Sequence, residues 1–162
     1  MVNKSFTPQR PRKKNMFKHI LLATDGSDAS EHAAQLAISM ARAQGAKLTA
    51  LFVVDPYPYM SIGEANPMGF QAYMAAAQEH AAQAHAKVSA LCNQGEGAPV
   101  DLQLRVVENV TASAGVVQTA KDEGVDLIVV GSHGRSGIAR LMLGSVAAKV
   151  VAESTVPVLV AR

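Results

Sequence analysis

The stretch Asp126-Leu-Ile-Val-Val-Gly131-Ser-His-Gly134-Arg-Ser-Gly137 decides the fold. Its first half is a short apolar run rich in β-branched residues, which is typical of a strand buried on both faces. Its second half is a loop rich in glycine. Nine residues separate Gly134 from Gly144-Ser145, which lies at the start of a segment that we expect to be helical over 143–153. A strand, a glycine loop and a helix in direct succession are typical of an α/β protein.

The same alternation extends along the rest of the chain. Strands are predicted over 18–25, 47–54, 100–107, 126–130 and 156–160, and helices over 28–44, 70–91, 111–123 and 143–153. Asp28 and Glu31, three residues apart, predict a capping box at the first helix, and Gly45 predicts its end. Residues 55–69 hold three prolines and two glycines, which predict an irregular flap beside a site. Strands joined by helices imply an α/β fold with an open parallel sheet and helices on both faces.

Composition is consistent with one domain. The 162 residues are 49% hydrophobic with one cysteine and no tryptophan, so a continuous core is expected without disulfides. No run approaches the roughly 20 apolar residues that cross a bilayer. We therefore expect a cytoplasmic protein with no membrane partner.

The first residues differ from the rest in charge. Five of the fifteen cations precede residue 15 without any acid, which leaves ten Lys and Arg against thirteen Asp and Glu in the remainder. We expect residues 1–15 to be a disordered basic arm and 16–162 to be the folded domain. The arm is either a solvated tail or a contact with an acidic partner or with nucleic acid, whereas the mildly acidic balance of the domain argues against nucleic-acid binding by the domain itself.

The loop after the fourth strand predicts a phosphate site. Glycines allow backbone N–H groups to approach phosphate oxygens, and a helix that starts at Gly144 offers unpaired N–H donors with a partial positive charge. The Ser145 hydroxyl adds a donor. Neither the P-loop spacing nor the dinucleotide fingerprint after the first strand is present, because only Gly26 occurs there.

Taken together, these residues resemble the universal stress protein family of the ATP-binding kind. The resemblance lies in Gly131-x-x-Gly134, nine residues and Gly144-Ser145, with the segments 20–27, 51–54, 126–131 and 156–160 in the same order. It implies an adenine nucleotide alpha hydrolase-like, five-stranded sheet of order 3-2-1-4-5, in which the first and fourth strands end side by side.

The resemblance also implies a ligand set for ATP. Asp25 would lie beside the nucleoside, and the backbone of Val53 would meet the adenine edge. Apart from the resemblance, the carboxylate of Asp25 is a candidate ligand for Mg²⁺. The residues expected to line the phosphates are Gly131, Ser132, His133, Gly134, Arg135, Gly144, Ser145 and Val146.

Several of these residues have a second interpretation. Asp25 could cap the helix that follows it, and His133 and Arg135 could point to solvent.

Other residue types that often mark sites are given structural interpretations. His80 and His85 are five apart, on different helix faces, so we expect a solvated surface and no zinc pair. Cys92 is expected to be a buried, inert thiol, and Met60, Met68 and Met74 are expected to fill gaps in the core.

The functional hypothesis is a stress-response regulator that acts through nucleotide occupancy and is not a dedicated enzyme. Phosphoryl transfer needs an oriented nucleophile and usually a base, and the sequence offers no evident base. The alternatives are a slow ATPase or an interaction module without nucleotide. The partners expected are an unidentified protein and a second copy bound through the apolar strand over 156–160.

Overall fold

A computed structural model describes residues 15–58, 67–95, 97–133 and 143–162. Five strands and four helices alternate along it. They are β1 (His19–Ala23), α1 (Asp28–Gln44), β2 (Lys47–Val54), α2 (Pro67–Asn93), β3 (Asp101–Glu108), α3 (Ala112–Asp122), β4 (Leu127–Gly131), α4 (Ser145–Glu153) and β5 (Val158–Ala161). The predicted boundaries differ by a few residues at most.

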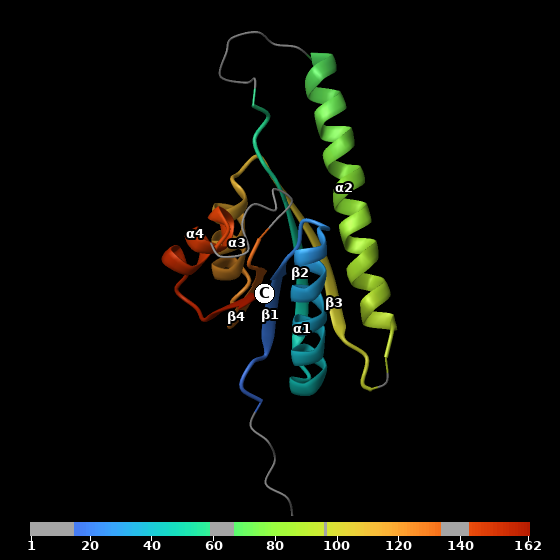
Figure 1. Ribbon diagram of the computed structural model, residues 1–162, viewed down its shortest axis with the longest axis vertical. Helices are drawn as coiled ribbons and strands as arrows, with labels where there is room; N and C mark the ends of the chain where they lie inside the picture. The colour runs from blue at the N-terminus through green and yellow to red at the C-terminus, as the bar shows by residue number, and fades with distance from the viewer. Residues whose placement is uncertain (1–14, 59–66, 96, 134–142) are drawn as a thin grey trace, which may run out of the picture.

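The strands form one parallel sheet in the order β3-β2-β1-β4-β5, which confirms the expected topology. The helices α1 and α2 cover one face, and α3 and α4 cover the other (Figure 1). The central strand β1 pairs with β2 on one side and with β4 on the other. The strand order therefore reverses between β1 and β4, where α/β proteins bind their ligands.

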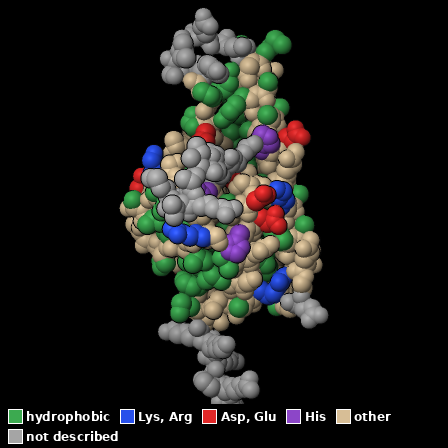
Figure 2. All heavy atoms as spheres, viewed as in Figure 1, with side chains coloured by type: hydrophobic (Ala, Val, Ile, Leu, Met, Phe, Trp, Pro, Cys, Tyr) green, Lys and Arg blue, Asp and Glu red, His purple; other side chains and the backbone are tan. Residues whose placement is uncertain are grey.

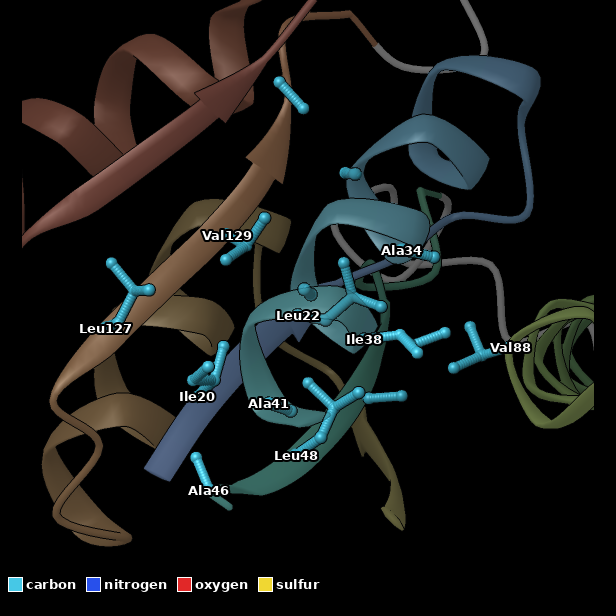
Figure 3. Packing of buried hydrophobic residues seen from close by; sticks show 14 residues of the cluster. Ile20, Leu22, Ala34, Ile38, Ala41, Ala46, Leu48, Val88, Leu127 and Val129 are labelled. Carbon is cyan, nitrogen blue, oxygen red and sulfur yellow. The ribbon is translucent and has the colours of Figure 1, made fainter. Parts of the chain in front are cut away.

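Small residues allow the helices to lie close to the sheet. On the α1 face, Ala33, Ala34, Ala37 and Ala41 pack against side chains of β1, β2 and β4 (Figure 3). The residues Ile20, Leu22 and Val129 project into this layer and are fully buried. On the opposite face a second cluster joins Leu21, Leu51 and Ile128 to α3 and α4. Alternate strand residues thus supply the two cores.

A polar network fixes the amino ends of the strands. The carboxylate of Asp126 accepts the backbone N–H of Lys18 at 2.9 Å and of His19 at 3.2 Å, which ties β1 to the start of β4. His19 Nε2 lies 2.8 Å from Thr49 Oγ1, and that hydroxyl donates to Glu123 at 3.1 Å. Arg105 Nε lies 3.2 Å from Glu123 Oε1. Strands β1, β2 and β3 are thereby linked to the end of α3.

The predicted capping box at Asp28 and Glu31 is wrong by one residue. Ser27 is the N-cap of α1, and its hydroxyl accepts the N–H of Ser30. The hydroxyl of Ser27 itself donates to Asp25 Oδ1 at 2.6 Å. A side chain outside the helix therefore holds the cap in place, and spacing within the helix could not indicate it.

The helix α2 departs most from the sequence predictions. Among the apolar residues of α2 only Ala81, Ala84 and Val88 are buried. The first half of the helix extends beyond the carboxyl ends of the strands, with hydrophobic side chains at its surface (Figures 1 and 2). Met68 is 81% exposed and Phe70 is 42% exposed. The expectation of a core position is therefore wrong for Met68. Met60 lies outside the described residues.

His85 and Cys92 also differ from expectation. His85 is buried and not solvated, because α2 turns this side chain toward the sheet. The thiol of Cys92 is partly buried rather than fully buried, and desolvation raises its pKa, with an opposing effect from Arg42. A raised thiol pKa lowers reactivity. Among the helices in the described segments, none has the length and apolar character needed to cross a membrane.

We predict that His85 makes the protein less stable in acid. Burial lowers the pKa of His85 from its ordinary 6.5, although hydrogen bonds with the backbone of Ala50 and Arg105 oppose the shift, and no described group hydrogen-bonds to its Nε2. Below pH 6.5 the unfolded chain takes up a proton that the folded chain does not. Stability therefore falls as pH decreases toward the lowered pKa, by at most about 1.4 kcal/mol per pH unit.

Urea unfolding between pH 7.5 and 5 would measure this effect in the wild type and in His85→Gln. The variant should lose less stability with acid than the wild type. His80→Gln, on the exposed side of the same helix, is the matched control and should behave like the wild type. Parallel curves for wild type and His85→Gln would contradict the prediction.

Candidate functional site

A pocket of about 350 Å³ lies across the carboxyl ends of β2, β1 and β4. This volume falls within the roughly 300 to 1,000 Å³ of small-molecule sites. The strand ends contribute Ala23, Thr24 and Asp25 from β1, Leu51, Phe52, Val53 and Asp55 from β2, and Val130, Gly131, Ser132 and His133 from β4. The helices contribute Ser30, Ala112 and Val116, and Gly144 to Ala147. The pocket therefore occupies the reversal of strand order between β1 and β4.

The N-terminus of α4 opens onto this pocket. Gly144 is the N-cap and has no side chain to accept a hydrogen bond, and the first intrahelical bond runs from Ala148 N–H to the Gly144 carbonyl at 2.9 Å. The N–H groups of Ser145, Val146 and Ala147 consequently lack acceptors within the helix. All three residues line the pocket. Three backbone donors and the positive end of a helix dipole suit an anion.

Gly131 and Gly144 are required by close packing of the backbone, whether or not a ligand binds in the pocket. A Cβ on Gly144 would lie 3.0 Å from the Ser132 carbonyl oxygen, and one on Gly131 would lie 3.0 Å from the Ala29 carbonyl oxygen. Gly144 N–H also donates to the Ser132 carbonyl at 2.7 Å. These residues therefore hold α4 and α1 against the end of β4. The glycine spacing alone is therefore not proof of a ligand, whereas no residue in the described segments accepts from the first N–H groups of α4.

Ser132 and His133 lie together in the pocket wall. Ser132 is buried, its N–H donates to the Ala161 carbonyl at 2.6 Å, and its Oγ lies 3.0 Å from His133 Nδ1. The structure thus places an imidazole beside a hydroxyl near the α4 N-terminus. Gly134 and Arg135, also predicted as phosphate contacts, lie outside the described residues.

Asp25 both orders a turn and lines the pocket. Its Oδ1 accepts the N–H and the hydroxyl of Ser27 at 3.0 and 2.6 Å. It is therefore not the N-cap of α1 but holds Ser27, which is, so the capping interpretation is wrong. The same carboxylate belongs to the pocket lining, so the ligand interpretation stays open.

Val53 lies at the opposite end of the pocket, against α3. A Cβ on Gly115 would lie 2.9 Å from both methyl groups of Val53, so α3 can approach β2 this closely only with a glycine there. Val116 of the same helix is buried and lines the pocket. This end is consequently walled by aliphatic side chains, which suits a flat apolar group.

Asp55 is a pocket residue that the sequence predictions missed. Its Oδ1 accepts the N–H of Ala112, the first residue of α3, at 3.1 Å, and its backbone carbonyl accepts the Tyr73 hydroxyl of α2 at 2.8 Å. The position was available from the sequence, because polar residues just beyond the end of a central parallel strand face the ligand crevice. The sequence prediction places Asp55 only at the start of the flap over 55–69.

The pocket residues could bind a magnesium ion only if phosphate groups of a ligand supplied most of its coordination. No cluster of three or more His, Cys, Asp or Glu side chains suitable for a metal occurs within the described segments. Mg²⁺ commonly binds through one or two carboxylates together with substrate phosphates and water. Asp25 is the carboxylate that could serve in this way, with one oxygen already engaged by Ser27.

Comparisons with a family model, with sequence relatives and with solved structures all indicate the same protein family. The model of the "Universal stress protein family" matches residues 16–162. A universal stress protein of Thermus aquaticus is 38% identical over 147 residues, which cover 91% of this chain and 100% of the relative. The protein is also similar to relatives whose structures have been solved.

Two solved structures have the same fold. The structure of the protein MJ0577 has a TM-score of 0.74 at 27% identity, and the alignment covers 90% of this chain and 96% of the MJ0577 chain. A universal stress protein crystallised in complex with cAMP has a TM-score of 0.63 at 28% identity and covers 90% of this chain and 97% of its own.

We predict that Gly144→Val weakens ATP binding by about tenfold or more, equivalent to about 1.4 kcal/mol or more. A branched side chain at this position would separate α4 from Ser132 and obstruct the exposed N–H groups. Calorimetric titration would measure the affinity, with circular dichroism to establish folding. Ala148→Val, at an exposed position one turn later in α4, should bind as the wild type does. An unchanged affinity in folded Gly144→Val would rule out the α4 N-terminus as the phosphate site.

Proposed function

Because the chain belongs to the universal stress protein family, we propose that it is an ATP-binding regulator whose nucleotide occupancy is read by a protein partner. The observation that supports this most directly is the open N-terminus of α4 in a pocket across three strand ends. A triphosphate supplies several anionic oxygens to its free N–H groups. The aliphatic end near Val53 and Val116 suits the base.

The comparison with known structures favours an adenine nucleotide as the ligand class. A relative of the same fold, at 28% identity over nine-tenths of this chain, was crystallised with cAMP. Its ligand shares the adenine and ribose of ATP. We propose ATP for this chain because three adjacent N–H donors can serve more phosphate oxygens than one cyclic phosphate offers.

A regulator fits the site better than a dedicated ATPase. Fast phosphoryl transfer needs charge and an oriented nucleophile matched to the transition state, not only to bound phosphate. His133 is the imidazole in the described pocket lining, and its Nδ1 lies within hydrogen-bonding distance of Ser132. Mg²⁺ would be held chiefly by the phosphates with Asp25 beside it. Such a site binds the ground state well and turns it over slowly.

We also propose that the protein acts in the cytoplasm as a homodimer paired through β5. This strand is one edge of the sheet, and Val158, Leu159 and Val160 are only partly buried. The carbonyls of Pro157 and Ala161 accept from β4 at 3.0 and 2.6 Å. Residues 157, 159 and 161 therefore direct their backbone groups inward, and those of Val158 and Val160 face outward, free to pair with a second copy.

Slow turnover is the expected behaviour with Mg²⁺. Purified protein should hydrolyse bound ATP well below the roughly 1 to 100 per second of dedicated phosphotransfer enzymes. A single-turnover assay with radiolabelled ATP would compare the wild type with Asp25→Ala and His133→Ala. A wild-type rate above about one per second, abolished in either variant, would establish an ATPase instead. Failure of the wild type to bind ATP at all would favour an interaction module without nucleotide.

The dimer can be tested at the outward N–H groups of β5. Val160→Pro removes one of these donors without removing a bond to β4, so we expect a monomer where the wild type is a dimer. Lysine substitutions are less suitable because Val158 and Val160 pack against the α3 and α4 cluster. Light scattering coupled to chromatography measures the mass, and thermal melting establishes folding. A monomeric wild type at micromolar concentration would exclude the dimer.

A further inference from the structure

Two helix N-termini border the pocket, and they differ in one respect. At α4 the N-cap is Gly144, and no described group accepts from the first N–H groups of the helix. At α3 the N-cap Thr111 makes no side-chain cap bond, but Asp55 Oδ1 accepts the N–H of Ala112 at 3.1 Å. The positive end of α3 is thus already neutralised by a carboxylate, whereas no carboxylate of the described residues bonds to the first N–H groups of α4.

This difference between the two helix N-termini determines which way round a nucleotide would lie in the pocket. A phosphate placed at α3 would lie beside the Asp55 carboxylate and repel it, whereas a phosphate at α4 meets unpaired donors. Both helices pack on the same face of the sheet and contact one another (Figure 1). The strand order places β2 and β4 on either side of β1, so the two ends of the pocket are about 10 Å apart at the usual strand spacing. The base is therefore left at the β2 and α3 end.

Asp55 is tied to that end through both its side chain and its backbone. Its Oδ1 accepts the N–H of Ala112, and its backbone carbonyl accepts the Tyr73 hydroxyl at 2.8 Å. The next aromatic residue, Tyr57, packs against Tyr73 and Phe70 with ring centroids 5.3 and 5.7 Å apart. None of the described residues donates to Asp55 Oδ2. A carboxylate oxygen in the same pocket lining as Val53 and Val116 is an acceptor that suits an amino group on a flat base.

We propose that Asp55 orients the nucleotide and selects its base, by closing the α3 N-terminus to phosphate and by accepting a hydrogen bond from the exocyclic amino group of adenine, while the Val53 backbone meets the rest of the adenine edge. This role rests on the proposed nucleotide site and adds a base-selecting residue to it. A carboxylate is an acceptor only, so a purine that lacks the amino group loses this bond.

The test compares ATP with purine riboside triphosphate, which lacks only the amino group. Wild-type protein should bind ATP about 5 to 10 times more tightly, the modest effect expected for a charge-assisted bond at a solvent-exposed residue. In Asp55→Asn the amide oxygen can still accept from Ala112, but the amide nitrogen replaces Oδ2 and is a donor. The preference for ATP should therefore fall to about twofold or less.

Glu108→Gln is the matched control. It makes the same chemical change at the end of the neighbouring strand β3, opposite Val54 in register and outside the pocket lining, so the ratio of the two affinities should stay at the wild-type value. Equal binding of the two nucleotides by the wild type, or an undiminished preference in folded Asp55→Asn, would overturn the assignment of Asp55 and leave the nucleotide site standing. Binding of neither nucleotide would overturn the proposed function itself.

Discussion

The site depends on one constraint, the position of β1 between two parallel neighbours. β1 pairs with β2 on one side and β4 on the other, and the helices that follow β1 and β4 pack on opposite faces. The two connections therefore diverge, and their divergence leaves a crevice beyond the strand ends. Gly131 and Gly144 then allow the backbones around the crevice to approach within about a van der Waals contact. A change in strand order would remove the crevice while leaving every helix and strand intact.

The polar groups at the two ends of the sheet differ in whether they are hydrogen-bonded within the protein. At the amino end, buried or nearly buried His19, Thr49 and Glu123 are joined in one hydrogen-bonded network, and Asp126 satisfies the N–H groups that begin β1. Buried polar groups without partners are costly, so this network fixes the strands. At the carboxyl end, N–H groups of α4 have no described acceptor but face an open pocket where water or a ligand can serve them. Stability is concentrated at one end and binding capacity at the other.

The sequence predicted those features that arise from local patterns. Apolar runs bounded by Gly, Pro and Asp located all five strands, and alternation with helices predicted the parallel sheet; the strand order came from the family resemblance. The capping residue Ser27, the burial of His85 and the exposure of Met68 depend on contacts between distant segments, and periodicity within α2 could not indicate which half of the helix meets the sheet. Asp55 was missed because its place in the flap concealed its position at a strand end.

A nucleotide that acts as a signal must change a surface, and it can do so only through contacts that differ between the bound and free states. Asp55 links the pocket to two such elements. Its carboxylate holds the first turn of α3, and its carbonyl holds Tyr73 of α2, whose first half extends beyond the sheet. Tyr57 packs on the same part of α2. A ligand that engages or displaces Asp55 would therefore act on the exposed first half of α2 through the hydrogen bond from Tyr73, which is a connection that the proposed regulator requires.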